Sequence, residues 1–201
     1  MVNKHPALLV CCLVFMLLAS SSAWACACCV NKGYYEHSRV KQSGYTSLFS
    51  EMKIDRTAEL YMTEGGFDEM RGLPDLANDE MALPEFEVRA SMSRRTWTFM
   101  IEAGARGRGA LTLPMPALFT KHLVDFDGVD SGLGVSLHKT FTLTGPVSSA
   151  TGIFKTANRG TTFSLVFLGR GNGCDNASDF TRWRLELSGP KAHYAFFGKL
   201  N

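Results

Sequence analysis

Residues 181–187, TRWRLEL, have the pattern that indicates the fold most clearly. Its side chains alternate between two kinds, with Trp183, Leu185 and Leu187 in one set and Arg182, Arg184 and Glu186 in the other. Successive side chains of a β-strand point to opposite faces of its sheet. The pattern therefore predicts a strand with one buried face and one wet face, as in antiparallel sheets.

The same alternation recurs along the chain, in FEVRASM (86–92), TWTFMIEA (96–103), HKTFTLT (138–144) and TFSLVF (162–167). Short segments rich in Gly, Pro and Ser separate these runs by gaps of hairpin size. We expect an all-β protein: a single antiparallel β-barrel or β-sandwich of about nine or ten short strands in a mostly meander order. One or two short helices are expected, near residues 46–52 and 73–82.

The inward positions of these strands predict one shared core. Its expected members are Trp97, Phe99, Ile101, Phe141, Leu143, Phe163, Leu165, Phe167, Trp183, Leu185 and Leu187.

The N-terminus has the three parts of a secretory signal peptide. Lys4 supplies positive charge, residues 7–18 form an apolar run, and Ala23-Trp24-Ala25 offers a cleavage site. Twelve apolar residues rise only about 18 Å as a helix, against about 30 Å of hydrocarbon, so no retained transmembrane span is expected. The predicted division is a signal peptide at 1–25, an irregular N-terminal segment with the Cys cluster at 26–56, and an antiparallel β domain at 57–201. The expected location is secreted or periplasmic.

The charge balance argues against one class of partner. The 201-residue chain has 21 basic and 19 acidic residues, and loss of Lys4 with the leader leaves 20 − 19 = +1. No basic tract is interleaved with aromatic residues, so no nucleic acid partner is expected.

Four cysteines follow the leader: Cys26, Cys28, Cys29 and Cys174. In an oxidising compartment we expect Cys174 to form a disulfide with one member of the cluster. Two alternatives remain open for the cluster. Cys26, Cys28 and Cys29 supply soft thiolates for a Cu(I) or Zn(II) ion, and a lipid could be attached at Cys26, although Trp24 fits such a signal poorly.

Other candidate sites have plain structural interpretations. The loop 168–180, LGRGNGCDNASDF, has three alternating glycines but precedes a strand, so it does not resemble a phosphate-binding loop. Asn176 begins a glycosylation sequon, usable only in a eukaryotic secretory pathway. Asp125, Asp127 and Asp130 miss the spacing of an EF-hand. Arg106 and Arg108 mark a hairpin tip.

Signatures of catalysis are absent from the sequence, which has no G-x-S-x-G and no H-E-x-x-H, and its histidines are scattered singly. We expect a binding or structural role with no catalytic machinery and no cofactor. One alternative is an envelope metal-handling protein that uses Cys26, Cys28 and Cys29. Another is an enzyme whose site assembles only in the fold.

Overall fold

The computed structural model describes residues 28–61, 85–93, 95–126, 135–158 and 160–201. In these residues the chain forms a single antiparallel sheet of eleven strands. The strands are β1 (Tyr35–Lys41), β2 (Ile54–Tyr61), β3 (Glu85–Met92), β4 (Thr96–Glu102), β5 (Arg108–Pro114), β6 (Leu118–Val124), β7 (Leu137–Pro146), β8 (Ser149–Gly152), β9 (Thr162–Gly171), β10 (Phe180–Ser188) and β11 (His193–Leu200). The all-β prediction is confirmed.

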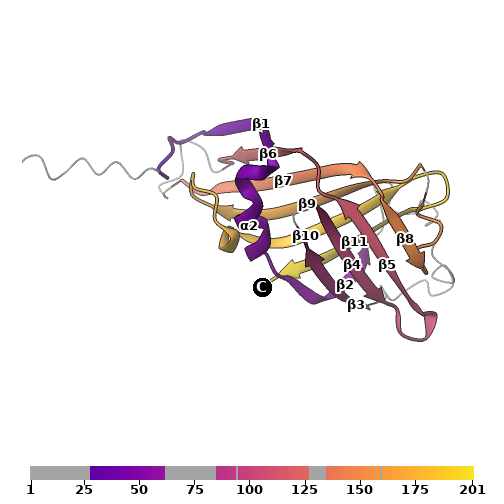
Figure 1. Cartoon of the computed structure of the whole chain (residues 1–201). Helices are drawn as coiled ribbons and strands as arrows, with labels where there is room; N and C mark the ends of the chain where they lie inside the picture. Colours follow the sequence, from indigo (N-terminus) through magenta and orange to yellow (C-terminus); the bar gives the residue numbers. More distant parts are fainter. Residues whose placement is uncertain (1–27, 62–84, 94, 127–134, 159) are drawn as a thin grey trace, which may run out of the picture.

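The sheet curls into a half-barrel (Figure 1). Its strand order is β1-β6-β7-β9-β10-β11-β2-β3-β4-β5-β8, so most neighbours in space are neighbours in the chain. Only Val147 and Ser148 separate β7 from β8, yet β8 lies at the far end of that order, paired with β5. The backbone N–H of Ser148 also donates to the carbonyl of Thr112 on β5. The sheet must therefore bend around until its β7 region reaches β5.

Aromatic side chains fill the concave side of the sheet. All eleven predicted core residues are buried, with no more than 3% of any of them exposed. Rings from opposite walls meet there: Trp97 on β4 lies 5.7 Å from Phe167 on β9, and Phe99 lies 5.7 Å from Trp183. Packed aromatic and aliphatic side chains therefore occupy this side of the sheet.

The helix α2 (Thr46–Glu51) crosses the concave face in front of the central strands (Figure 1). Its Phe49 is fully buried and lies 5.2 Å from Phe119 on β6 and 5.8 Å from Phe167. A helix of six residues is too short to be stable alone, so its packing on the sheet holds it in place. The helix expected near residues 46–52 is confirmed, and the one expected at 73–82 lies outside the described residues.

The N-terminal segment contains more regular structure than its sequence predicts. The segment 26–56, expected to be irregular, contains β1, α2 and the start of β2. β1 lacks an apolar pattern because its inward side chains include Glu36 and Ser38. These two side chains face a buried lysine instead of apolar groups. Three short 3₁₀ turns complete the described structure: η2 (Gln42–Tyr45), η3 (Gly104–Arg106) and η4 (Ala177–Asp179).

Candidate binding edge

One end of the sheet is formed by β1, which pairs with β6 and with no other strand of the described residues (Figure 1). Its side chains alternate strictly, so that Tyr35, His37, Arg39 and Lys41 are exposed. On the side away from β6, no strand of the described ranges pairs with the backbone of β1. An unpaired edge of seven residues is a ready template for another extended segment.

Rings gather on the outer face beside this edge. The strand register sets His37 directly opposite His122 on β6, with their ring centroids 5.5 Å apart. Tyr35 lies 5.3 Å from the same His122 ring, edge to face. The Nε2 atom of His122 is buried and has no hydrogen-bond partner within the described residues.

A second ring pair extends this face onto β7. His138 lies opposite Val124, and its ring is 4.9 Å from that of Phe126. Phe126 and Tyr35 are the two most exposed large apolar side chains of the described residues, at 69% and 64%. We call Tyr35, His37, His122, Phe126 and His138 together the aromatic–histidine face. Single exposed rings are ordinary on protein surfaces, but several on one patch are typical of a contact surface.

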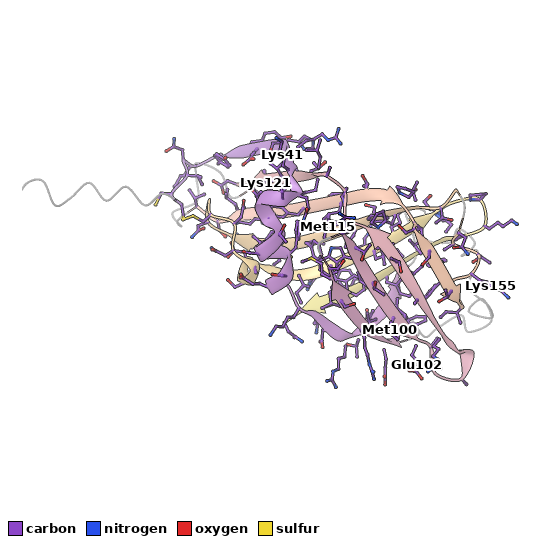
Figure 2. The ribbon with its side chains drawn as sticks, viewed as in Figure 1. Lys41, Met100, Glu102, Met115, Lys121 and Lys155 are labelled. Atoms are coloured by element: carbon purple, nitrogen blue, oxygen red, sulfur yellow. A yellow bond between two sulfur atoms is a disulfide. The ribbon has the colours of Figure 1, made fainter. Side chains whose placement is uncertain are left out.

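The inner side of the same strands carries a buried charge cluster. Lys121 on β6 forms an ion pair of 2.6 Å with Asp175 and lies 3.6 Å from Glu36 on β1. The hydroxyl of Tyr45 donates to the same oxygen of Asp175 at 2.9 Å. Figure 2 shows Lys121 beside α2.

The charge of Asp175 determines how its neighbours titrate. Burial lowers the pKa of Lys121, but the hydrogen bond and charge of Asp175 outweigh that effect and raise its pKa above the ordinary value. Burial, followed by the hydrogen bond to Asp175, raises the pKa of Tyr45. Lys121 is therefore cationic and Tyr45 neutral at physiological pH. A charged lysine is no nucleophile, so this pair holds structure rather than attacking a substrate.

Lys139 on β7 lies deeper in the same cluster. Its side chain is fully buried and forms a 2.7 Å ion pair with Asp179, while Asp175 Oδ1 lies 3.8 Å from its Nζ atom. Its ammonium also donates to the backbone carbonyl of Cys174. Removing a charge from water is costly unless partners surround it, and these three partners all come from the loop after β9.

That loop is tied to the N-terminal segment by a disulfide between Cys28 and Cys174. The predicted pairing of Cys174 with a member of the cluster is confirmed. Cys29 is exposed, and Cys26 lies outside the described residues. The metal-handling alternative uses the thiolates of Cys26, Cys28 and Cys29, of which Cys28 is bonded to Cys174 in this structure.

The three alternating glycines let neighbouring segments of the chain pack closely against the backbone of this loop. A Cβ atom at Gly173 would lie 2.7 Å from the carbonyl oxygen of Cys28, and one at Gly169 or Gly171 would collide with Asp179. The N–H of Gly173 donates to that Cys28 carbonyl at 2.8 Å. The glycine run thus serves to seat the disulfide and the buried carboxylate, in line with its structural interpretation.

The remaining sequence candidates lie apart from one another. Asp125 is buried and its carboxylate accepts the N–H of Gly33 at 2.9 Å, while Asp127 and Asp130 lie outside the described residues. Asn176 is exposed in the loop before η4. Arg108 is exposed at the start of β5, and the structure does not describe the side chain of Arg106. His193 lies on β11, away from the other histidines.

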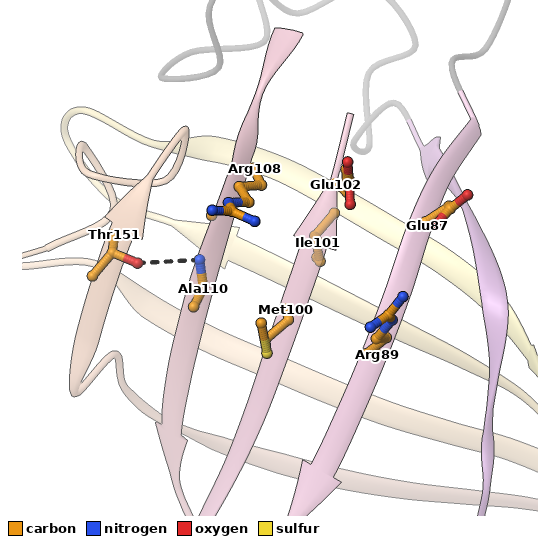
Figure 3. A pocket seen from close by; sticks show the side chains of 9 residues that line it. Glu87, Arg89, Met100, Ile101, Glu102, Arg108, Ala110 and Thr151 are labelled. Carbon is orange, nitrogen blue, oxygen red and sulfur yellow. Dashed lines mark hydrogen bonds between the residues drawn. The ribbon is translucent and has the colours of Figure 1, made fainter. Parts of the chain in front are cut away.

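An open depression lies at the other end of the sheet from β1, over β3, β4, β5 and β8 (Figure 3). Met100 lies at its centre, with 56% of the side chain exposed. Arg89 lies opposite Met100, and Glu102 lies opposite both Arg108 and Glu87. The depression carries charges of both signs, which favour no single class of ligand. The aromatic–histidine face is therefore the stronger candidate for a binding site.

Within the described ranges, no group of three or more His, Cys, Asp or Glu side chains is placed to hold a metal ion. No helix in the described part of the chain is long and apolar enough to cross a bilayer.

Comparisons with known proteins add no assignment. No family model matches the chain, and neither a curated protein nor a solved structure matches it.

Proposed function

We propose that the protein is an exported binding domain that holds an extended, acidic segment of a partner protein along the open edge of β1. The observation that supports this proposal best is the unpaired edge itself, flanked by an exposed aromatic–histidine face. The packed interior argues against a small ligand held inside the sheet.

Main-chain hydrogen bonds would supply the affinity of such a complex. A strand that adds to a sheet edge satisfies the free N–H and C=O groups of that edge, and its alternate side chains lie beside those of the edge strand. On β1 those side chains are Tyr35, His37, Arg39 and Lys41.

The side chains of β1 favour an acidic partner. Arg39 and Lys41 are exposed at one end of the strand, and Figure 2 shows Lys41 at the end of β1. Charged residues on an edge also discourage pairing with neutral or basic strands. An acidic segment gains from both cations, while Tyr35 at the other end offers apolar contact.

Rigidity of the edge strengthens the proposal. The buried ion pairs of Lys121 with Glu36 and Asp175 hold the inner face of β1 and β6, and the disulfide fixes the segment that leads into β1. A binding strand that is already ordered loses less conformational entropy when its partner arrives.

Export is the second part of this proposal. The predicted signal peptide at residues 1–25 and the Cys28–Cys174 disulfide both suit an oxidising compartment. We expect the secreted or periplasmic protein to begin at or within about three residues of Cys26, as judged from its intact mass. A mature protein that still carries residues 1–18 would contradict export by cleavage.

The binding proposal is tested with two short peptides that alternate valine with glutamate or valine with lysine. We expect the glutamate peptide to bind the mature protein and the lysine peptide not to bind, by fluorescence anisotropy. Reversing both cations, in the double variant Arg39→Glu, Lys41→Glu, should weaken binding about tenfold or more.

The matched control is Arg89→Glu, which reverses an exposed charge on the outer face of β3. This variant should bind the glutamate peptide as the parent protein does. Equal binding of both peptides, or equal loss in the control and the β1 variant, would show that the β1 edge does not select the partner.

A further inference from the structure

We propose that Lys139 and Asp179 become joined by an intramolecular isopeptide bond, formed by the protein itself. The Nζ atom of Lys139 lies 2.7 Å from Oδ2 of Asp179, within reach of the carboxyl carbon. The lysine side chain is fully buried, and that of Asp179 is 16% exposed. The pair is thus a nucleophile and an acyl carbon held together in a place with little water.

A third group is placed to move protons. Oδ1 of Asp175 lies 3.8 Å from Lys139 Nζ and is buried, with no hydrogen-bond partner among the residues that the structure describes. The other oxygen, Oδ2, is held by Lys121 at 2.6 Å and by the hydroxyl of Tyr45 at 2.9 Å. Asp175 therefore keeps one fixed oxygen and one free oxygen, and the free one is the oxygen that lies closer to Lys139. A carboxylate in this position suits general acid–base catalysis.

The backbone prevents the reacting pair from separating. Asp179 ends the 3₁₀ turn η4, which lies so close to β9 that only glycine fits at positions 169 and 171. Gly169 is the register partner of Lys139. On the far side of the loop the disulfide fixes Cys174, whose carbonyl accepts a hydrogen bond from Lys139. Because the two groups are already held together, their reaction avoids the loss of translational and rotational entropy that a bimolecular reaction has.

Apolar side chains surround the pair along both segments. Leu137 and Phe141, the inward neighbours of Lys139 on β7, are fully buried, and Phe180 follows Asp179 directly. The rings of Phe141 and Phe180 lie 4.7 Å apart. Burial disfavours two opposite charges and tolerates a hydrogen-bonded neutral amide, so condensation removes a cost that the ion pair carries.

The reaction balances without a further reagent. Asp175 takes one proton from the Lys139 ammonium and delivers it to the Asp179 carboxylate, leaving an amine and a carboxylic acid. The amine nitrogen attacks Cγ of Asp179, forming the new C–N bond. Asp175 then carries a second proton from nitrogen to one hydroxyl, the C–O bond breaks, and water leaves. The products are one amide and one water molecule.

Intact mass of the purified protein tests this step directly. After reduction of the disulfide, we expect a mass lower than that of the linear chain by one water molecule. Trypsin cannot cut after an acylated lysine, so fragment 122–155 should remain whole and joined to fragment 171–182. The full linear mass, with cleavage after Lys139, would overturn the proposal. A cross-link that involves Lys121 instead would overturn it as well.

Three variants assign the roles. Lys139→Arg keeps the charge but should abolish the mass deficit, and Asp175→Ala should leave the protein folded but uncyclised, with Lys139 cut by trypsin. Lys121→Arg, which preserves the cation beside Asp175, should retain the deficit. Loss of the deficit in Lys121→Arg together with its retention in Asp175→Ala would contradict the assigned proton carrier.

Discussion

Cys28 and Cys174 lie 146 residues apart in the chain, and the disulfide between them brings their Cα atoms to 4.7 Å. This bond connects the segment before β1 to the loop that supplies Asp175 and Asp179. The edge strand and the buried charge cluster are therefore held by one covalent link.

Removing that link should lower stability strongly. The variants Cys28→Ser and Cys174→Ser should each lose about 2 to 5 kcal/mol of unfolding free energy, because a loop this long restricts the unfolded chain by about 5 kcal/mol at most. Chemical denaturation measures the loss. Cys29→Ser, the exposed neighbour, is the control and should cost far less. Equal costs for all three would mean that the link is different in solution.

The assignment of faces is tested on β10. Trp183 is fully buried, whereas Arg184 points to the outer side and pairs with Glu186 there. Trp183→Ala should cost about 3 to 5 kcal/mol of unfolding free energy. Arg184→Ala should cost at most about 1 kcal/mol, since partly exposed ion pairs contribute little. Similar small costs at both positions would contradict the facing of the strand.

The indole of Trp183 lies against the backbone of Gly198 on β11. A Cβ atom at Gly198 would lie 2.6 Å from the indole Nε1, closer than any normal contact. Gly198→Ala should therefore destabilise the protein by about 1 to 3 kcal/mol, as overpacked cores do. Gly44→Ala is the matched control, because open space surrounds that position, and its effect should stay within about 0.5 kcal/mol. An unchanged melting temperature in Gly198→Ala would show that the indole is not seated there.

The sequence predicted most of the sheet because its strands have a continuous apolar face. It missed the charge cluster, although Lys121 and Lys139 occupy inward positions of their strands, in phase with Phe119 and Phe141. A lysine at a position where the alternation predicts an inward side chain was the available signal for buried charge. The partners of these lysines follow from the fold of the loop around Asp175, which periodicity does not encode.

The aromatic–histidine face could not be predicted from the sequence for a different reason. Histidines that are single in the sequence meet because β1 pairs with β6 in a register that sets His37 against His122. The apolar pattern fixes register where one face is buried, but β1 has a polar inner face and carries no such pattern. His138, also single in the sequence, lies beside Phe126.

Alkaline pH should reveal the buried phenols. Burial raises the pKa of Tyr194, whose hydroxyl is buried without a hydrogen-bond partner in the described residues, and of Tyr45. The native state therefore keeps these protons above about pH 10, where the unfolded chain releases them. Stability that is fully present below about pH 10 is then lost as the pH rises, by at most about 1.4 kcal/mol per pH unit for each tyrosine.

Tyr194→Phe separates this effect from general alkaline unfolding. The variant should be at least as stable as the parent at neutral pH, because no hydrogen bond to the hydroxyl is lost. Its unfolding free energy should also fall less steeply above about pH 10, as followed by denaturant titration at several pH values. A steeper fall would contradict the buried, neutral state of this phenol.

Site-resolved amide hydrogen exchange of the mature protein, with and without the valine–glutamate peptide, tests the binding edge most directly. We expect amides within Tyr35–Lys41 to exchange more slowly when the peptide is present, and those of β3, β4 and β5 to be unchanged. Protection spread over the depression around Met100, or no protection of β1 at saturating peptide, would contradict the assignment of β1 as the binding edge.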